Sequence, residues 1–383
     1  MKSRAMGGHS VWAEINVPAL IHNLHEVTRL VGRGTEVMAV VKANAYGHGL
    51  VDTARVFLEN GADRLGVARP GEGIELRRAG IGAPIVLLGY TPPDVYREVL
   101  EHELTVTLYD YELARLLSEQ AGNLGTTAYV HLKIDTGMQR LGLQVNDGIY
   151  KEILRIALLP HLDIEGLFTH FAKADEKDKR HANEQLLRFF ELTCTLGQDG
   201  LDIPLLHAAN SAAIIDLPES HMNLVRPGIM LYGLYPSDQV DRKNVRLRPA
   251  LSLKAQVSMV KKVSAGTGIS YGCTYTTPDA RVVATVPVGY GDGYARLLSN
   301  KGEVLVHGVR VPVIGTVCMD QIIIDVTRVD GVAVGDEVVL YGSQMGAELP
   351  VEDLAHRIGT INYEITCALS ARVPRIYIRP QEN

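Results

Sequence analysis

The chain has 383 residues, of which 46% are hydrophobic and 21% are charged, and its formal net charge is -6. This length indicates two domains with a large apolar core. The negative net charge and the lack of a dense Lys/Arg block argue against a nucleic-acid partner. No apolar run reaches the ~18 residues that a membrane span needs, and residues 1–10 lack the apolar core of a secretory signal. The four cysteines are far apart, so we expect a cytoplasmic protein with reduced thiols and without a structural metal site.

The most informative segment is Val37–Gly49, where five apolar residues with strand character end at Lys42 and a turn with two glycines follows. A lysine at the end of a buried strand can have a lowered pKa, because a low dielectric disfavours the ammonium ion. The neutral amine can hold a carbonyl as an imine, as a lysine that carries pyridoxal 5'-phosphate (PLP) does. Taken alone, the residue is more simply interpreted as a lysine that extends its charged end to water; the rest of the chain favours the cofactor.

Between residues 36 and 230, short apolar runs alternate with helical patterns, and several helical patterns stop at a glycine that could cap them. Eight such units favour a (β/α)8 TIM-like barrel, with a doubly wound open sheet as the alternative. The predicted strands are Val37–Val41, Arg64–Val67, Pro84–Leu88, Leu104–Leu108, Tyr129–Ile134, Ile164–Phe168, Leu205–Ala208 and Leu224–Arg226. The clearest predicted helices are Leu50–Asn60, Tyr111–Gln120, Ile149–Leu159 and Glu184–Leu196, and the candidate cap glycines are Gly61, Gly80, Gly122 and Gly197.

After residue 247 the pattern changes to strands separated by Gly or Asp turns, and helical periodicity returns only at Val351–Ile358. We therefore predict a barrel over residues 14–247 and a mostly β domain over residues 248–383, which residues 1–13 could join. The predicted strands of this second domain are Leu251–Val263, Arg281–Val288, Glu303–His307, Val309–Ile314, Gln321–Val326 and Asp336–Tyr341.

Polar side chains lie at the carboxyl ends of five of the predicted barrel strands, at the rim where barrel enzymes place their working residues. Each alone has a structural explanation, but five on one rim indicate a site. Barrels often bind phosphate in the loops after strands seven and eight, which here offer Ser211 and the pair Gly228 and Ile229. The five segments are Lys42–Tyr46, Lys133–Arg140, Thr169–His170, His207–Ser211 and Arg226–Ile229.

These segments, together with motifs in the β domain, resemble those of alanine racemases over nearly the whole chain. This family joins a PLP-binding barrel to a β domain. The most specific match is Val41–Gly49; the others are Asp135–Gly142, Asn210–Ala212, Arg226–Ile229, Ser270–Gly272, Val317–Gln321 and Ile361–Glu364.

The resemblance implies a cytoplasmic homodimer that uses PLP to interconvert L-alanine and D-alanine for peptidoglycan. It implies that Lys42 binds PLP and acts as one of two bases, while Tyr271 of the partner subunit is the other. For the cofactor, the resemblance implies that Tyr46, Ser211, Gly228, Ile229 and Tyr363 hold the phosphate, that Asn210 also binds the cofactor, and that His170 packs beside the ring. It implies that Arg226 faces the pyridine nitrogen and that His207 orients Arg226. Arg140 and the backbone amide of Met319 of the partner subunit would take the substrate carboxylate, and Lys133 is a possible carbamate.

Two residues depart from the family pattern, and two other enzyme assignments stay open. Cys273 stands where we expect a smaller or different residue, and Thr316 stands where many relatives have arginine. Neither residue is expected to take part in the chemistry. A racemase of broader or different amino-acid range is one alternative. A PLP amino-acid decarboxylase of the same build is the other, but Arg226 argues against it, because such enzymes are expected to place an acid at the pyridine nitrogen. A single-barrel PLP carrier would lack the β domain and Tyr271.

Overall fold

The computed structural model describes residues 8–379 and consists of two compact units. One unit, the barrel unit, contains residues 19–45 and 49–248. The other, the β unit, combines the N-terminal segment through Pro18, the short segment Tyr46–His48 and the chain from Pro249 onward. The sequence analysis places the first boundary between residues 13 and 14, whereas the structure keeps β1 (Val11–Asn16) whole within the β unit.

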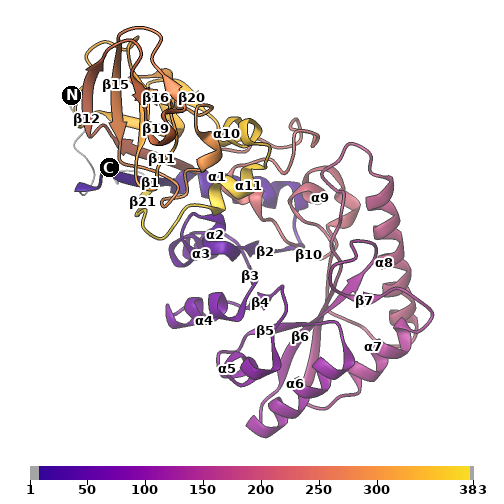
Figure 1. Ribbon diagram of the computed structural model, residues 1–383. Coiled ribbons are helices and arrows are strands. Elements are labelled where there is room, and N and C mark those ends of the chain that lie inside the picture. The colour runs from indigo at the N-terminus through magenta and orange to yellow at the C-terminus, as the bar shows by residue number, and fades with distance from the viewer. Residues whose placement is uncertain (1–7, 380–383) are drawn as a thin grey trace. The chain divides into compact units, whose positions relative to one another are not determined.

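Eight parallel strands form the sheet of the barrel unit, as predicted, in the order β10-β2-β3-β4-β5-β6-β8-β9. Figure 1 shows the part of this order from β10 to β6. The short strand β7 (Leu143–Gln144) adds to β6. The backbone nitrogen of Arg226, just after β10, donates to the carbonyl of Ala209, just after β9, at 3.0 Å. This bond joins the two ends of the order, so the sheet is a nearly closed barrel rather than an open sheet. The strands are β2 (Glu36–Val40), β3 (Arg64–Val67), β4 (Ile85–Leu87), β5 (Thr105–Leu108), β6 (Ala128–Asp135), β8 (Leu162–Phe168), β9 (Leu205–His207) and β10 (Leu224–Val225).

The helices of the barrel unit lie outside the ring of strands (Figure 1). Amphipathic helices cover a parallel sheet in this way because both faces of such a sheet are apolar. Inside the ring, Met38, Val86, Leu205 and Leu224 form part of the packed core. The main helices are α1 (Val17–Val31), α3 (Leu50–Glu59), α4 (Pro70–Arg78), α5 (Tyr96–Glu101), α6 (Tyr111–Leu124), α7 (Ile149–Ala157), α8 (Arg180–Gln198) and α9 (Ser211–Asp216).

Two of the four predicted cap glycines are wrong. Gly122 lies inside α6, whose cap is Gly125 with φ of 67°, and Gly197 lies inside α8, which ends at Gln198. Packing explains the first case, because a Cβ atom on Gly122 would lie 3.0 Å from the ring of His161. A glycine inside a helix can thus allow another side chain to approach closely, rather than cap the end of the helix.

The β unit contains a seven-stranded sheet, a three-stranded sheet (β12-β15-β18) and the hairpin β13-β14. The sequence predicts one strand over Leu251–Val263, but the structure divides it. Val257 donates its backbone N–H to Asp336 and Ser258 donates to Thr285, so the chain passes from the first sheet to the second at this point. The elements are β11 (Leu251–Gln256), β12 (Met259–Val263), β13 (Gly268–Ile269), β14 (Tyr275–Thr276), β15 (Arg281–Val286), β16 (Glu303–Val306), β17 (Val309–Pro312), β18 (Ile322–Asp325), β19 (Glu337–Gln344), β20 (Ala347–Leu349), β21 (Arg375–Ile378), α10 (Val351–Ile358) and α11 (Asn362–Cys367).

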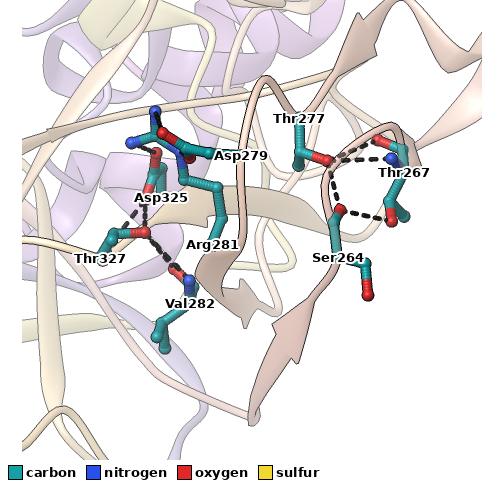
Figure 2. Close-up of polar contacts among 8 residues, drawn as sticks. All are labelled: Ser264, Thr267, Thr277, Asp279, Arg281, Val282, Asp325 and Thr327. Carbon is teal, nitrogen blue, oxygen red and sulfur yellow. Dashed lines mark hydrogen bonds and ion pairs between the residues drawn. The ribbon is translucent and has the colours of Figure 1, made fainter.

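Polar contacts hold the three-stranded sheet and the hairpin of the β unit (Figure 2). Arg281 of β15 pairs with Asp279 at 2.5 Å and with Asp325 of β18 at 3.3 Å. At the open end of the hairpin, Oγ1 of Thr277 accepts from the backbone nitrogen of Thr267 at 2.9 Å. Because the hairpin spans Gly268–Thr276, these contacts fix both ends of the segment that carries Tyr271.

Candidate active site

Lys42 follows β2, and the four residues after it adopt a left-handed backbone with φ between 52° and 54°. This conformation costs roughly 1–2 kcal/mol for each residue other than glycine. Four hydrogen bonds hold the turn. Oδ1 of Asn44 accepts from Leu50 at 2.8 Å and its carbonyl accepts from Gly49 at 2.9 Å. Glu72 accepts from Ala43 at 2.7 Å, and the carbonyl of Val41 accepts from Ala45 at 2.8 Å. Strained backbone that the surroundings hold in place is concentrated at functional sites, which supports a functional role for Lys42.

Arg226 is buried. It lies at the same barrel rim as Lys42, because it follows β10, the parallel neighbour of β2. Its Nη1 donates to Nδ1 and to the carbonyl of His207, at 2.8 and 2.9 Å. Its Nη2 donates to the carbonyls of Thr169 and Ala208, at 2.8 and 3.0 Å, and to Nδ1 of His170 at 3.2 Å. All five bonds end on neutral acceptors. Burial lowers the pKa of Arg226 to about 9, which leaves a buried positive charge at neutral pH.

The two histidines beside Arg226 are neutral. Burial and the charge of Arg226 lower the pKa of His170 and of His207 well below the ordinary value. The charge of Lys42 also contributes to lowering the pKa of His170, which places the lysine within electrostatic range of this group.

Lys133, in β6, is a second buried cation candidate, with 6% of its surface exposed. Its Nζ donates to the carbonyl of Ile134 at 2.8 Å and lies 5.2 Å from the ring centre of Phe168. Burial and the charge of Arg226 lower the pKa of Lys133 to about 7. A substantial fraction of this lysine is therefore a neutral amine at physiological pH.

The loop that carries Arg140 is shaped by Asp135 at the end of β6. Its carboxylate accepts four successive backbone N–H groups, those of residues 137–140, at 2.9 to 3.1 Å. Burial works to raise the pKa of Asp135, but these bonds outweigh it and leave the pKa below its ordinary value. The side chain of Arg140 is exposed on the folded loop.

The candidate phosphate residues of the barrel unit are in contact with one another. Asn210 caps α9 by accepting from Ala213 at 3.1 Å. The hydroxyl of Ser211 accepts from the backbone nitrogen of Gly228 at 2.9 Å, while Ile229 opens the short helix that follows. The structure thus brings together the two loops after β9 and β10.

The remaining predicted site residues belong to the β unit. Tyr46 and Tyr363 are separated by 317 positions in the sequence, yet their ring centres lie 6.1 Å apart. Tyr271 and Met319 are 73% and 51% exposed in the single chain. Thr316 donates its hydroxyl to the carbonyl of Tyr271 at 2.8 Å, so this threonine supports the backbone of the exposed tyrosine.

Two further polar residues of the barrel, His131 and Glu165, were not predicted from the sequence. Nδ1 of His131 lies 2.8 Å from Nε2 of His207, and Nε2 of His131 lies 3.5 Å from Glu165. The alternation of strands could have found His131, because it precedes Lys133 by two residues and therefore points to the same face of β6.

Other kinds of site are not apparent in residues 8–379. In this range, no group of three or more His, Cys, Asp or Glu side chains could hold a metal ion, and no helix combines the length and apolar character of a membrane span. Within the described residues, Cys194, Cys273 and Cys318 form no disulfide.

Comparison with known proteins identifies the family of both units. The family model of the alanine racemase N-terminal domain matches residues 15–236, and that of the C-terminal domain matches residues 250–377. An alanine racemase of Desulforamulus reducens is 52% identical over 368 residues, which cover 96% of this chain and 99% of the relative.

Solved structures give the same result. The crystal structure of alanine racemase from Bacillus anthracis with bound L-Ala-P is 39% identical, with a TM-score of 0.91, and covers 98% of this chain and 96% of that one. A histidine racemase from Leuconostoc mesenteroides is 30% identical, with a TM-score of 0.89, and covers 97% of this chain and 99% of that one. From its sequence and its fold, this chain belongs to the alanine racemase family.

Proposed function

We propose that this chain is a PLP-dependent racemase that interconverts L-alanine and D-alanine. The observation that carries the proposal is Arg226, a buried cation with only neutral partners, at the same barrel rim as the strand-end lysine Lys42. Such a charge suits an electron-pair donor such as a pyridine nitrogen. The named activity of the relatives supports the substrate and reaction class.

The residues present fit PLP by the chemistry of their donors. Lys42 would be the attachment point, His170 would lie beside the ring, and Arg226 would face the pyridine nitrogen. The phosphate would take the hydroxyls and backbone amides around it, for which we propose Tyr46, Asn210, Ser211, Gly228, Ile229 and Tyr363. When bound, PLP supplies the electron sink that lets the α-carbon of an amino acid lose its proton.

Arg226 would tune this chemistry. Because a guanidinium does not give up its proton at physiological pH, it would leave the pyridine nitrogen unprotonated. The two neutral histidines would hold the guanidinium in place without competing for its charge. Arg226 would thereby limit side reactions such as transamination.

Racemisation requires a base on each face of a planar carbanion, and each positioned acid–base group contributes about 10²–10⁴-fold. We assign these roles to Lys42 and to Tyr271 of the partner subunit. The exposure of Tyr271 in the single chain, 73%, supports a role toward a second copy. The functional protein would thus be a homodimer with shared sites.

The substrate carboxylate would bind Arg140, on the loop that Asp135 shapes, and the backbone amide of Met319 of the partner subunit. The neutral form of Lys133 could add CO2 through its nitrogen and release one proton, which gives a carbamate. Its lowered pKa, about 7, supports this step. The carbamate would provide Arg140 with an anionic partner.

A racemase with a different or broader substrate range is the second candidate, and the histidine racemase with the same fold favours keeping it. The decisive experiment incubates the pure protein with PLP and each of several L-amino acids, alanine and histidine among them, and measures the D-enantiomer. We expect D-alanine to form fastest. Faster conversion of another amino acid would show that this amino acid, and not alanine, is the preferred substrate. Release of CO2 would indicate a decarboxylase. We place the reaction in the cytoplasm, as a supply of D-alanine for peptidoglycan.

A further inference from the structure

A column of polar side chains runs through the barrel unit, where barrels are usually filled with branched apolar residues. It begins at Arg226 after β10 and continues through His207 of β9, His131 of β6 and Glu165 of β8. Arg64, the first residue of β3, closes it with a 2.5 Å ion pair to Glu165. Both histidines are fully buried, so each ring nitrogen needs a partner inside the protein.

Two hydrogen bonds, from Arg226 to His207 and between His207 and His131, determine the proton order of this column. The contact between Nε2 of His131 and Glu165 is longer than an ordinary hydrogen bond and acts through the charge of the carboxylate. Nη1 of Arg226 has only protons to offer, so Nδ1 of His207, 2.8 Å away, must be the acceptor. The neutral ring of His207 therefore carries its proton on Nε2. This proton points to His131, whose Nδ1 is 2.8 Å away and must also accept. The proton of His131 is then on Nε2, which lies 3.5 Å from Glu165.

The far end of the column is an anion. The interaction with His131 and the hydrogen bond and charge of Arg64 lower the pKa of Glu165 to about 2, although burial opposes this. Burial also lowers the pKa of His131, so this histidine stays neutral between the two neighbours. A carboxylate can only accept a hydrogen bond. The opposite proton order would turn a lone pair of His131 toward this carboxylate and an N–H of His207 toward the guanidinium, which are both repulsive.

The backbone accommodates this arrangement. β6 and β8 shift their register between Val130 and His131. A Cβ atom on Gly166, the residue after Glu165, would lie 2.6 Å from the ring of His131. The strand thus needs a glycine beside the ring of this histidine.

We propose that His131 and Glu165 are positioning residues for Arg226: together they reinforce, from the other side of His207, the proton order that the guanidinium requires, so that a lone pair of His207 stays turned to Arg226. The inference rests on the proposed role of Arg226 at the pyridine nitrogen. Neither His131 nor Glu165 would touch substrate or cofactor.

Two substitutions of His131 separate positioning from simple packing. The amide oxygen of His131→Asn can occupy the place of Nδ1 and accept from His207, while His131→Leu fills the space without an acceptor. We expect wild type and His131→Asn to keep the Nε2–H form of His207, and His131→Leu to populate the other form as well. Long-range proton–nitrogen NMR spectra of protein with isotope-labelled histidine rings measure this directly, with His207→Gln to assign the signal.

The second readout is pyruvate released per racemisation, which reports transamination. We expect this pyruvate ratio to rise about tenfold in His131→Leu, because a charge-assisted hydrogen bond of Arg226 is lost when His207 changes its proton order. The ratio should stay near the wild-type value in His131→Asn. A wild-type His207 with its proton on Nδ1 would overturn the proposal, as would a His131→Leu protein with a changed tautomer and an unchanged pyruvate ratio. If His131→Leu does not fold, Glu165→Gln, which keeps the shape but removes the charge, takes its place with the same expected direction.

Failure of the proposed function would look different. In that case the wild-type protein would not racemise any amino acid, or Arg226→Glu would leave the pyruvate ratio unchanged. The tautomer of His207, which is measured without cofactor, tests the proton order independently of both.

Discussion

The side-chain oxygen of Asn44 accepts a hydrogen bond from the backbone nitrogen of Leu50 at 2.8 Å, and this bond closes the left-handed turn after Lys42. Asparagine tolerates the left-handed region better than alanine does. We expect Asn44→Gly, which loses the bond only, to lower the free energy of unfolding by about 1 kcal/mol. Asn44→Ala also adds backbone strain, and the loss should reach about 2 kcal/mol. Urea denaturation of the two variants checks this order, and equal stability of the two would contradict the role of strain.

The second prediction concerns the cofactor lysine. The purified protein should be yellow with PLP, and borohydride should fix the cofactor to Lys42, because this lysine leaves a buried strand at the barrel rim. Peptide mapping locates the label. Label on Lys133 instead would show that the wrong lysine has been assigned, and Lys42→Arg serves as the control that should lose the label.

The third prediction concerns Arg226→Glu. A glutamate could stabilise a protonated pyridine nitrogen, so racemisation should fall while transamination rises as a share of turnover. The rates of D-alanine and pyruvate formation measure the two. The matched control is Arg226→Lys, which keeps a positive charge and should change this share less. An Arg226→Glu enzyme with normal racemisation and no pyruvate would remove Arg226 from the proposed mechanism.

The fourth prediction concerns the two bases. Lys42→Ala and Tyr271→Phe should each inactivate the homodimer, because every site then lacks one base. In a mixed dimer, one site collects both defects and the other collects none. The purified heterodimer should therefore recover roughly half of the wild-type activity. A heterodimer of verified mass that stays inactive would mean that both bases come from one chain.

The fifth prediction concerns Lys133 and pH. Because burial lowers its pKa to about 7 in the folded protein, from about 10.4 in the unfolded chain, the unfolded state binds more protons between these values. The free-energy penalty that Lys133 imposes on folding is thus fully present below the folded-state pKa. It disappears as the pH rises toward the unfolded-state pKa. Lys133→Met should be more stable than wild type at neutral pH, and the difference should vanish in alkaline buffer. Urea denaturation at a series of pH values, in CO2-free buffer to exclude a carbamate, measures it; a difference that is independent of pH would contradict the lowered pKa.

Much of the architecture could be predicted from the sequence, because its causes are local. A strand buried on both faces must be nearly continuous in apolar residues, and eight such runs between amphipathic helices indicate a barrel. The same logic placed Lys42, His170, His207 and Arg226 at one rim, since each lies at or just after the carboxyl end of a predicted strand.

Only the tertiary structure decided the rest, because it depends on contacts between distant residues. Gly122 and Gly197 have the residue type of a helix cap, but the packing of α6 and the length of α8 place both inside helices. The pairing of Tyr46 with Tyr363 joins residues that no local pattern relates. The column from Arg226 to Glu165 arises because β6, β8, β9 and β10 turn their inward side chains to one axis. A sequence displays which residues face inward, but the donors and acceptors that meet there are set by strand register, and register is a property of the folded barrel.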